Sequence, residues 1–309
     1  MANLTMVTGF LLIGFSNIWE LQVLYAILFL LIYLVALMGN LLIFTLISLD
    51  EHLHSSMYFF LKNLSFLDLC LISTTLPKSI TNSLSHHHSI SFMGCVLQVF
   101  LVIFFAASEL FLLTMMSYDR YVAIYQPLHY EVIMTRGICM KMATVSWLIG
   151  GLFGALYSAS TFTLPFCGSK EIQQFFCDVP ALLRISCSET HIALDFTMAF
   201  GFGLGIFCFI YITISYSHIF STVLKIPATE GRSKAFSTCL PHLIVLMVFI
   251  ITAAIVYLKP PQESDSVIVL FLSIIYTVVP PTLNPVIYSL RNKDIKSSLR
   301  KLIAWKHFS

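Results

Sequence analysis

Seven stretches of this chain are each apolar over about the 20 residues that a helix needs to cross a bilayer. They lie near residues 22–49, 57–83, 92–124, 138–163, 190–224, 236–258 and 266–289. Hydrophobic residues make up 58% of the chain and charged residues only 10%, against about 25% charged residues in an ordinary soluble domain. A soluble core of 309 residues could not cover that much apolar surface. The sequence therefore predicts an all-α membrane protein, a seven-transmembrane helix bundle that forms a single domain over residues 1–309.

Basic residues in the connecting loops predict the orientation of the bundle, because cytoplasmic loops carry an excess of Lys and Arg. An extracellular amino terminus places all but four of the 17 Lys and Arg residues on the cytoplasmic side. The four that remain outside are Lys78, Lys170, Arg184 and Lys259. We therefore expect an extracellular tail over residues 1–21, a helix bundle over 22–289 and a cytoplasmic tail over 290–309. Asn3 then begins a glycosylation sequon on the extracellular side.

Four of the cysteines fall on the predicted outer side. Cys95 begins the third span, and Cys167, Cys177 and Cys187 lie in the loop between the fourth and fifth spans. Thiols in an oxidising compartment favour disulfides, so two bonds are expected, and the sequence alone allows three pairings. The loop from about 164 to 189 is long for a helix connection, and a bond to the third span would hold it over the bundle as a lid. Extracellular stability alone is an equally supported role for such a bond, and the two roles are compatible.

Two carboxylic acids lie inside predicted spans. Glu109 precedes Arg120 by 11 residues, or about 16 Å along a helix axis, which places it near the depth of Asp68. Two such acids must be protonated, paired, or share a cation. Two interpretations remain open: a hydrogen-bonded polar cluster that fixes helix packing, or a sodium or proton site whose occupancy differs between two conformations.

A second charged feature, Asp119-Arg120, lies at the cytoplasmic end of the third span. An unpaired ion near hydrocarbon costs at least about 2.5–3.5 kcal/mol, and Arg120 cannot lose its proton, so it must be paired or hydrated in every state. The pair is either a static interfacial ion pair or a switch in which Arg120 changes partners.

Several strings resemble known receptors. Asp119-Arg120-Tyr121, Trp147 and the 284–288 segment together resemble a rhodopsin-type G-protein-coupled receptor. Longer strings resemble the olfactory (odorant) receptor family in order along nearly the whole chain. They are LHSSMYFFL at 53–61, MSYDRYVAI at 116–124, SY at 215–216, KAFSTCLPHL at 234–243 and PTLNPVIYSLRN at 281–292. The chain departs from the family pattern at Ser56, where a proline is usual, and at Tyr125, where a cysteine is usual.

The resemblance implies a structural frame. It pairs Cys95 with Cys177 and Cys167 with Cys187, and it places the protein in the plasma membrane. After the seventh span, apolar residues recur at helical spacing among lysines and an arginine over residues 293–303. This pattern predicts a short amphipathic helix that lies on membrane lipid.

The resemblance also implies a mechanism, in which the sixth span moves outward and admits a G protein. The residues that it implicates in this switch are Asp119, Arg120, Tyr121, Tyr216, His242, Asn284, Pro285 and Tyr288. The implied partners are a small volatile odorant and a stimulatory, olfactory-type heterotrimeric G protein that raises cyclic AMP. We expect no nucleic-acid partner and no cofactor other than sodium at the two buried acids.

The ligand is expected in the outer halves of the third, fifth, sixth and seventh spans. The candidate contacts are Val102, Ile103, Ala106, Ala107, Phe200, Leu204, Ala253, Ala254, Tyr257, Ser273 and Thr277. None of these side chains is charged, so the set predicts a small, neutral, mostly apolar ligand held by shape and one hydrogen bond.

Other function classes have weaker support in the sequence. Intramembrane acids such as Asp68 and Glu109 also occur in transporters and channels, but the chain shows no matched repeats of the kind typical of transporters. The motifs H-E-x-x-H and G-x-S-x-G and a nucleotide-binding glycine loop are absent, so the sequence does not favour an enzyme.

Overall fold

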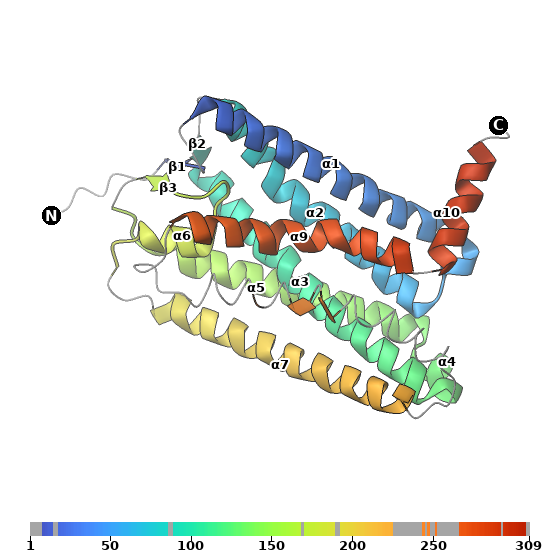
Figure 1. The fold of residues 1–309 in the computed structure, drawn as a ribbon. Coiled ribbons are helices and arrows are strands. Elements are labelled where there is room, and N and C mark those ends of the chain that lie inside the picture. The colour runs from blue at the N-terminus through green and yellow to red at the C-terminus, as the bar shows by residue number, and fades with distance from the viewer. Residues whose placement is uncertain are drawn as a thin grey trace.

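Six long helices run through the part of the chain that the computed structural model describes (Figure 1). The described residues are 8–14, 18–85, 89–167, 170–188, 192–224, 243–244, 246–247, 251, 266–291 and 293–306. The long helices are α1 (Trp19–Leu49), α2 (Ser56–Leu84), α3 (Phe92–Tyr125), α5 (Arg136–Phe162), α7 (Ile192–Leu224) and α9 (Ser266–Arg291). Their ends lie within three residues of the six corresponding predicted spans. The predicted span 236–258 lies mostly outside the described residues.

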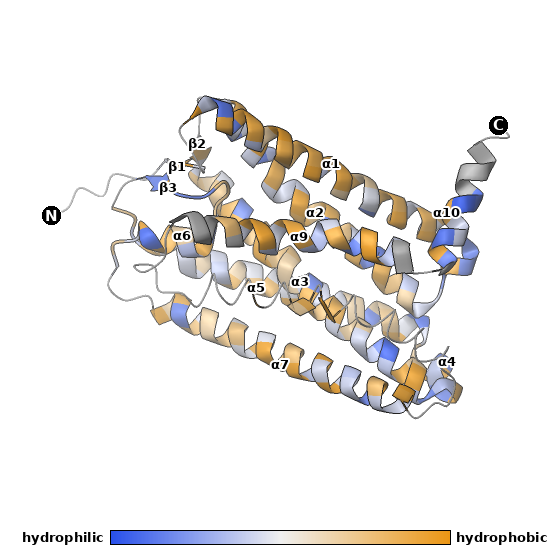
Figure 2. Ribbon diagram, viewed as in Figure 1, coloured by the Kyte–Doolittle hydropathy of each residue, from blue (hydrophilic) through white to orange (hydrophobic). Residues whose placement is uncertain are grey.

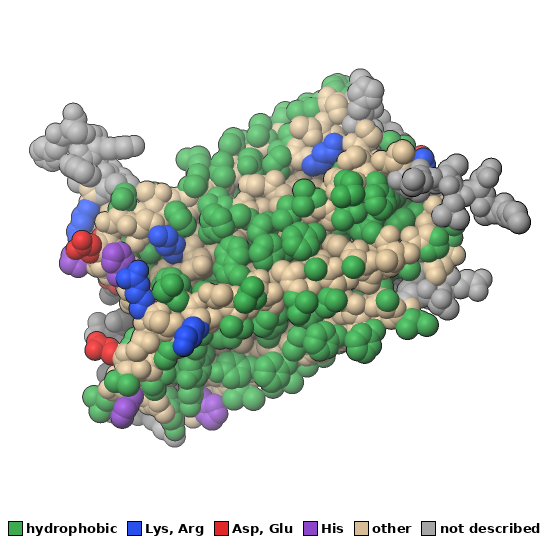
Figure 3. All heavy atoms as spheres, turned by 180° about the vertical axis from the view of Figure 1, so that it is seen from behind, with side chains coloured by type: hydrophobic (Ala, Val, Ile, Leu, Met, Phe, Trp, Pro, Cys, Tyr) green, Lys and Arg blue, Asp and Glu red, His purple; other side chains and the backbone are tan. Residues whose placement is uncertain are grey.

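Five of these helices, α1, α2, α3, α5 and α7, are long and apolar enough to cross a membrane. In Figure 2 hydrophobic colouring runs along most of α1, and the other helices show hydrophobic residues alternating with more hydrophilic ones. On the face seen in Figure 3, hydrophobic side chains cover the centre, and most of the visible charged side chains gather toward one end. This distribution suits a protein whose middle lies in hydrocarbon and whose ends lie in water.

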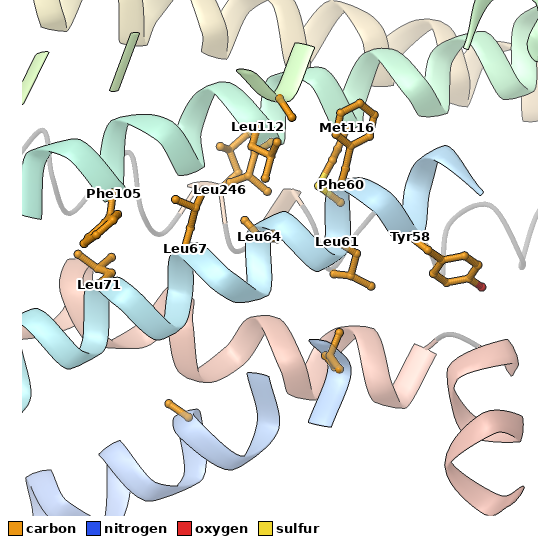
Figure 4. Close-up of a cluster of buried hydrophobic side chains, with 14 of the residues drawn as sticks. Tyr58, Phe60, Leu61, Leu64, Leu67, Leu71, Phe105, Leu112, Met116 and Leu246 are labelled. Atoms are coloured by element: carbon orange, nitrogen blue, oxygen red, sulfur yellow. The ribbon is translucent and has the colours of Figure 1, made fainter. Parts of the chain in front are cut away.

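Helix α3 lies at the centre of the bundle, where it packs against α2, α5 and α7, while α9 packs against α1 and α2. A row of buried α2 side chains faces α3 in Figure 4. It includes Phe60, Leu64 and Leu67, and opposite it α3 contributes Leu112 and Met116. Burying a large apolar side chain away from water contributes about 1.5–3 kcal/mol to the stability of a soluble protein. In lipid the same contacts stabilise the bundle through close packing.

The two ends of the bundle are built differently. One end, which we call the sheet end, carries the three-stranded sheet β2-β1-β3, formed by β1 (Gly9–Leu12), β2 (Ser89–Ser91) and β3 (Glu171–Ile172), and the short helix α6 (Val179–Arg184). Strand β1 is antiparallel to β2 and parallel to β3. The segment expected as a simple tail thus contains a strand, and its Phe10 and Leu12 are buried. The sheet was not predicted, because a four-residue strand carries almost no periodicity.

The other end, which we call the α10 end, carries η1 (Glu51–Leu53), η2 (Pro127–His129), α4 (Tyr130–Ile133) and α10 (Lys293–Lys306). Helix α10 turns away from the axis of α9 (Figure 1) and confirms the short helix predicted after the last span. Ser298 of α10 donates to Asp50 at the end of α1, with 2.5 Å between the oxygens. That hydrogen bond, followed by one from the backbone of His52, holds the pKa of Asp50 below its usual range.

Small residues let α3 and α5 approach closely. A Cβ atom added at Gly150 would lie 2.6 Å from the carbonyl oxygen of Phe104 and would overlap the hydroxyl of Ser108. One turn further along, a Cβ at Gly154 would lie 2.8 Å from the carbonyl oxygen of Phe100. Backbone atoms cannot move aside as a flexible side chain can, so these two glycines set the distance between the helices.

We expect Gly150→Ala to lower the thermal stability of the purified protein by about 1–3 kcal/mol and to reduce its surface expression, because the added methyl group forces α3 and α5 apart. Gly151→Ala is the matched control, since its Cβ would lie 3.9 Å from the nearest atom of Phe104. At position 151 the higher helix propensity of alanine, worth about 0.5–1 kcal/mol, is therefore the only expected effect on stability. Equal unfolding temperatures for the two variants would contradict this account of the interface.

Candidate functional site

A polar cluster lies inside the bundle, where α2, α3 and α9 meet. The side-chain amide of Asn284 donates to both carboxylate oxygens of Asp68, at 3.3 and 3.1 Å, and to Glu109 Oε1 at 3.2 Å. All three side chains are buried, with at most 3% of their surface exposed. Glu109 Oε2 has no hydrogen-bond partner within the described helices and loops. The structure thus brings the two predicted acids together around one amide, a contact that their matching depth alone did not establish.

The prolines of α9 explain a second polar contact. Pro285 has no N–H, so the carbonyl of Pro281 lacks its helical partner four residues on. Asn40 of α1 fills this role by donating from Nδ2 to that carbonyl at 2.8 Å. Gly39 lets α1 lie close enough to α9 for this hydrogen bond, because a Cβ atom at this position would lie only 3.0 Å from carbon atoms of the Pro285 ring. The neighbouring glycine and asparagine of α1 are therefore matched to the proline of α9.

At the α10 end, Asp119 holds two partners. Arg120 donates to Asp119 Oδ2 from Nε at 3.0 Å and from Nη2 at 2.5 Å, and Tyr130 of α4 donates to Oδ1 at 2.7 Å. Asp119 is 1% exposed, whereas the side chain of Arg120 is 24% exposed. Burial, together with the hydrogen bond to Asp119, raises the pKa of Tyr130 to about 12, so its hydroxyl keeps the proton that it donates.

Both departures from the family pattern named above make contacts in this region. The hydroxyl of Ser56, at the start of α2, donates to the carbonyl of Met134 at 3.1 Å, a bond that proline could not form. The ring of Tyr125 stacks on that of Tyr121, with centroids 5.2 Å apart and planes 13° apart. The edge of Tyr121 also meets the ring of His218 on α7, at a centroid distance of 6.1 Å.

The loop at the sheet end is fixed to the bundle by covalent and hydrogen bonds. The structure contains disulfides between Cys95 and Cys177 and between Cys167 and Cys187. Residues 174–178, which we call the strap, are all buried. Gln98 of α3 accepts from the backbone N–H of Cys177 at 2.8 Å. The strap is therefore held against α3 by a covalent bond and by a hydrogen bond.

The strap also contacts three other long helices. Ser79 of α2 donates to the carbonyl of Phe175 at 3.2 Å, and the Phe175 ring meets the edge of Phe29 on α1, with centroids 5.3 Å apart. On α9, Ser273 and Tyr276 bind strap side chains: Gln174 donates to Ser273 Oγ at 3.2 Å, and Tyr276 donates to Asp178 Oδ2 at 2.9 Å. These contacts agree with the expectation of a lid fastened over the bundle.

The candidate ligand residues that are described divide between two places. Val102 belongs to the main buried cluster of the bundle, as do Phe175 and Phe176 of the strap and Tyr276 of α9. Ser273 and Thr277 are buried on α9. Three others pack instead against a smaller cluster near α5 and the sheet; they are Ile103, Ala107 and Leu204.

Of the two remaining described candidates, one is exposed and one is half-buried. Phe200 is 50% exposed and stacks on Phe153 of α5, with centroids 5.7 Å apart. Ala106 is half-buried. The predicted site residues Asn3, His242, Ala253, Ala254 and Tyr257 lie outside the described residues. Their roles stay predictions.

Among the predicted switch residues on α7 and α9, Tyr216 and Pro285 are buried. The hydroxyl of Tyr288 is buried and has no hydrogen-bond partner in the described part of the chain. A tyrosine hydroxyl without a partner suits a residue that gains one in another conformation.

Sequence reasoning missed the partners that come from short elements. Tyr130, Gln174 and Asp178 lie in connections, where no helical period marks a buried side chain. One signal for Asp178 was available, since an Asp-x-Pro sequence is typical of a helix start, and Asp178 accepts from the first N–H of α6 at 2.9 Å.

Comparison with known proteins agrees with this architecture. A family model described as "Olfactory receptor" matches residues 29–306. The chain is 64% identical to Olfactory receptor 14A2 of Homo sapiens over 303 residues, which cover 98% of this chain and 96% of the relative. It is 59% identical to human Olfactory receptor 14A16, with 99% of both chains covered. It is also 46% identical to Olfactory receptor 1G1 of Gorilla gorilla gorilla, with 97% of this chain and 96% of that protein covered.

These matches span nearly the whole chain, and the family that they identify folds as a seven-helix bundle of the G-protein-coupled receptor class. The described helices are those of such a bundle, and the two disulfides lie at its sheet end. The chain therefore belongs to the olfactory receptor family and is a multi-pass membrane protein that serves as an odorant receptor.

Proposed function

We propose that this receptor binds small, mostly apolar odorants at the plasma membrane and activates a stimulatory, olfactory-type G protein, which raises cyclic AMP. In this proposal the sheet end is extracellular and bears the amino terminus with its glycosylation site at Asn3. The α10 end is cytoplasmic and carries the G-protein surface. The observation that most supports the proposal is the Tyr130–Asp119–Arg120 contact at the α10 end. In this contact Asp119 holds the Arg120 cation, which can leave Asp119 and bind another partner.

The ligand acts by shifting a population. A receptor with a resting and an active state responds to any molecule that binds the active state better. In the resting state Arg120 is held by Asp119; in the active state it is released toward the incoming G protein. The outward motion of the sixth span, with Tyr216, His242 and Tyr288 as inner contacts, would make that surface accessible.

Screening of a chemically broad panel of volatiles tests this function. We expect some of these compounds to raise cyclic AMP in cells that carry the receptor and a cyclic AMP reporter, and the response to vanish in cells that lack the stimulatory G protein. Ala106→Trp should block it by filling the proposed ligand site. Ligand-independent current through the purified protein in lipid bilayers, with no cyclic AMP response, would favour a channel.

The two buried acids need a neutralising cation. Glu109 Oε2 accepts no hydrogen bond from the residues that the structure describes, so either a proton on this carboxyl or a sodium ion held by Asp68 and Glu109 fits the cluster. Sodium would lower the electrostatic repulsion between the carboxylates and favour the state in which they lie close together. We propose no other cofactor, no catalytic activity and no nucleic-acid partner, and we place α10 on membrane lipid.

A further inference from the structure

The strap contains a buried carbonyl that lacks a hydrogen-bond donor. Gln174 is 2% exposed, and its Oε1 atom has no hydrogen-bond partner among the described residues. Its Nε2 atom already donates to Ser273 Oγ at 3.2 Å, which leaves the carbonyl as the unsatisfied half of the amide. A buried carbonyl without a donor costs about as much as a lost hydrogen bond, so more than nine in ten such groups in folded proteins are paired.

This carbonyl lies beside residues expected to meet the ligand. Ser273 and Thr277 follow one another along one face of α9, four residues apart, and Thr277 donates to the backbone carbonyl of Ser273 at 2.6 Å. The adjacent strap residues Phe175 and Phe176 belong to the same buried cluster as Val102 of α3. Gln174 therefore brings a polar atom from the loop to the part of α9 that carries the predicted ligand contacts Ser273 and Thr277.

A second unsatisfied amide lies at the same end. Asn82 is buried on α2, and no residue in the described part of the chain forms a hydrogen bond with its Nδ2 or Oδ1 atom. It lies three residues from Ser79, which binds the strap at Phe175, so it is on about the same face of the helix. The sheet end thus has more buried hydrogen-bonding atoms than the described residues satisfy, as a site does when its ligand supplies the rest.

We infer that Gln174 is a ligand-specificity residue, and that the preferred odorants carry one hydrogen-bond donor, an alcohol or a phenol, whose hydroxyl donates to Gln174 Oε1. The inference rests on the proposed odorant function and narrows its ligand class. An ether, an aldehyde or a ketone of the same shape offers only acceptors and leaves the carbonyl unpaired. Discrimination by a buried hydrogen-bonding atom should exceed that given by an added methylene group.

Matched pairs of compounds test this inference. The probes are straight-chain primary alcohols from hexanol to decanol and benzyl alcohol, each with its methyl ether and its aldehyde. We expect each active alcohol to be about 10- to 100-fold more potent than its ether in the cyclic AMP assay. Gln174→Leu should remove that difference, whereas Gln173→Leu should retain it, because Gln173 is the same side chain one position away and exposed.

A second readout separates this inference from the proposed function. Thermal unfolding of the purified receptor is measured with each alcohol and with its ether, because this stabilisation needs no G protein. Selective stabilisation by alcohols that depends on Gln174 would support the inference even if no cyclic AMP appeared. Cyclic AMP responses with equal potency for alcohol and ether, or a preference that survives Gln174→Leu, would overturn the inference and leave the receptor function intact.

Two checks complete the design. Surface expression is measured for every variant, and Gln174→Met provides a second apolar replacement should Gln174→Leu reach the surface poorly. Stronger binding of aldehydes than of alcohols would assign the opposite hydrogen-bonding role to the site and would overturn the inference. The absence of both stabilisation and signalling with every alcohol would overturn it as well.

Discussion

Arg120→Leu should abolish the odorant-evoked cyclic AMP response while the receptor still reaches the cell surface. The guanidinium is the one cation of the Tyr130–Asp119–Arg120 contact, and its hydrogen bonds to described residues go to Asp119 alone. Leucine has similar length but no charge, so it preserves packing and removes the group that the G protein would meet. The measurements are ligand-evoked cyclic AMP and surface labelling in the same cells.

Tyr130→Phe is the matched comparison for this prediction. It keeps the ion pair and removes only the 2.7 Å hydrogen bond that helps to hold Asp119, a neutral-to-charged bond of about 1.5–3 kcal/mol. We expect signalling to survive and its ligand-free level to rise, because the resting state loses the bond. A normal response from Arg120→Leu would show that the pair is a static interfacial contact.

Asn284→Leu should cause a large loss of stability, about 3 kcal/mol or more, and strongly reduce surface expression. The Asn284 amide donates to the carboxyls of both Asp68 and Glu109, so its removal leaves two buried acids without their shared donor. The apparent unfolding temperature of the purified receptor measures the loss. Leu283→Ala is the control, since Leu283 is the adjacent residue on α9 and is 37% exposed.

Repeating Asn284→Leu in a receptor without the two buried acids isolates the electrostatic part of the loss of stability. In the Asp68→Asn, Glu109→Gln receptor the two amides carry no charge and can donate to one another. Asn284→Leu should therefore cost much less in that background than in the wild type. The same cost in both backgrounds would mean that Asn284 acts through packing and not through the buried acids.

The sodium alternative is tested on the same variants. Sodium at the acid pair would raise the unfolding temperature of the wild-type receptor relative to an equal concentration of choline. The Asp68→Asn, Glu109→Gln receptor should not respond, because it lacks the carboxylates. Equal unfolding temperatures in sodium and in choline would indicate that Asp68 and Glu109 share a proton and do not bind sodium.

Hydrophobic content was enough to predict most of the fold. A helix in lipid satisfies its own backbone hydrogen bonds, so each long apolar run is a span, and the ends of α2 and α3 fell within one residue of their predicted positions. The same reasoning could not find β1, whose pairing with β2 and β3 joins segments far apart in the sequence. Short strands are decided by tertiary contacts.

Site residues divide in the same way. Asp68, Glu109 and Arg120 were recognisable from the sequence because charge inside an apolar run is costly wherever the helices pack. The hydrogen-bond partners of these residues were harder to predict from the sequence. That Asn284 would contact both acids, and that Tyr130 would contact Asp119, depends on how the helices rotate and where a loop returns.

The sequence by itself thus determined that this protein folds in a lipid bilayer, where its helices lie along the chain and which charged positions need partners. The free energy of transferring a side chain from water to lipid depends mainly on its type and its depth. Only the tertiary structure decided which partner each one has. It placed Asn40 against the carbonyl freed by Pro285, and Gln174 against α9 with its carbonyl unpaired. Hydrogen bonds are directional and short, so they are fixed by the packing of helices whose spacing and rotation no single segment encodes.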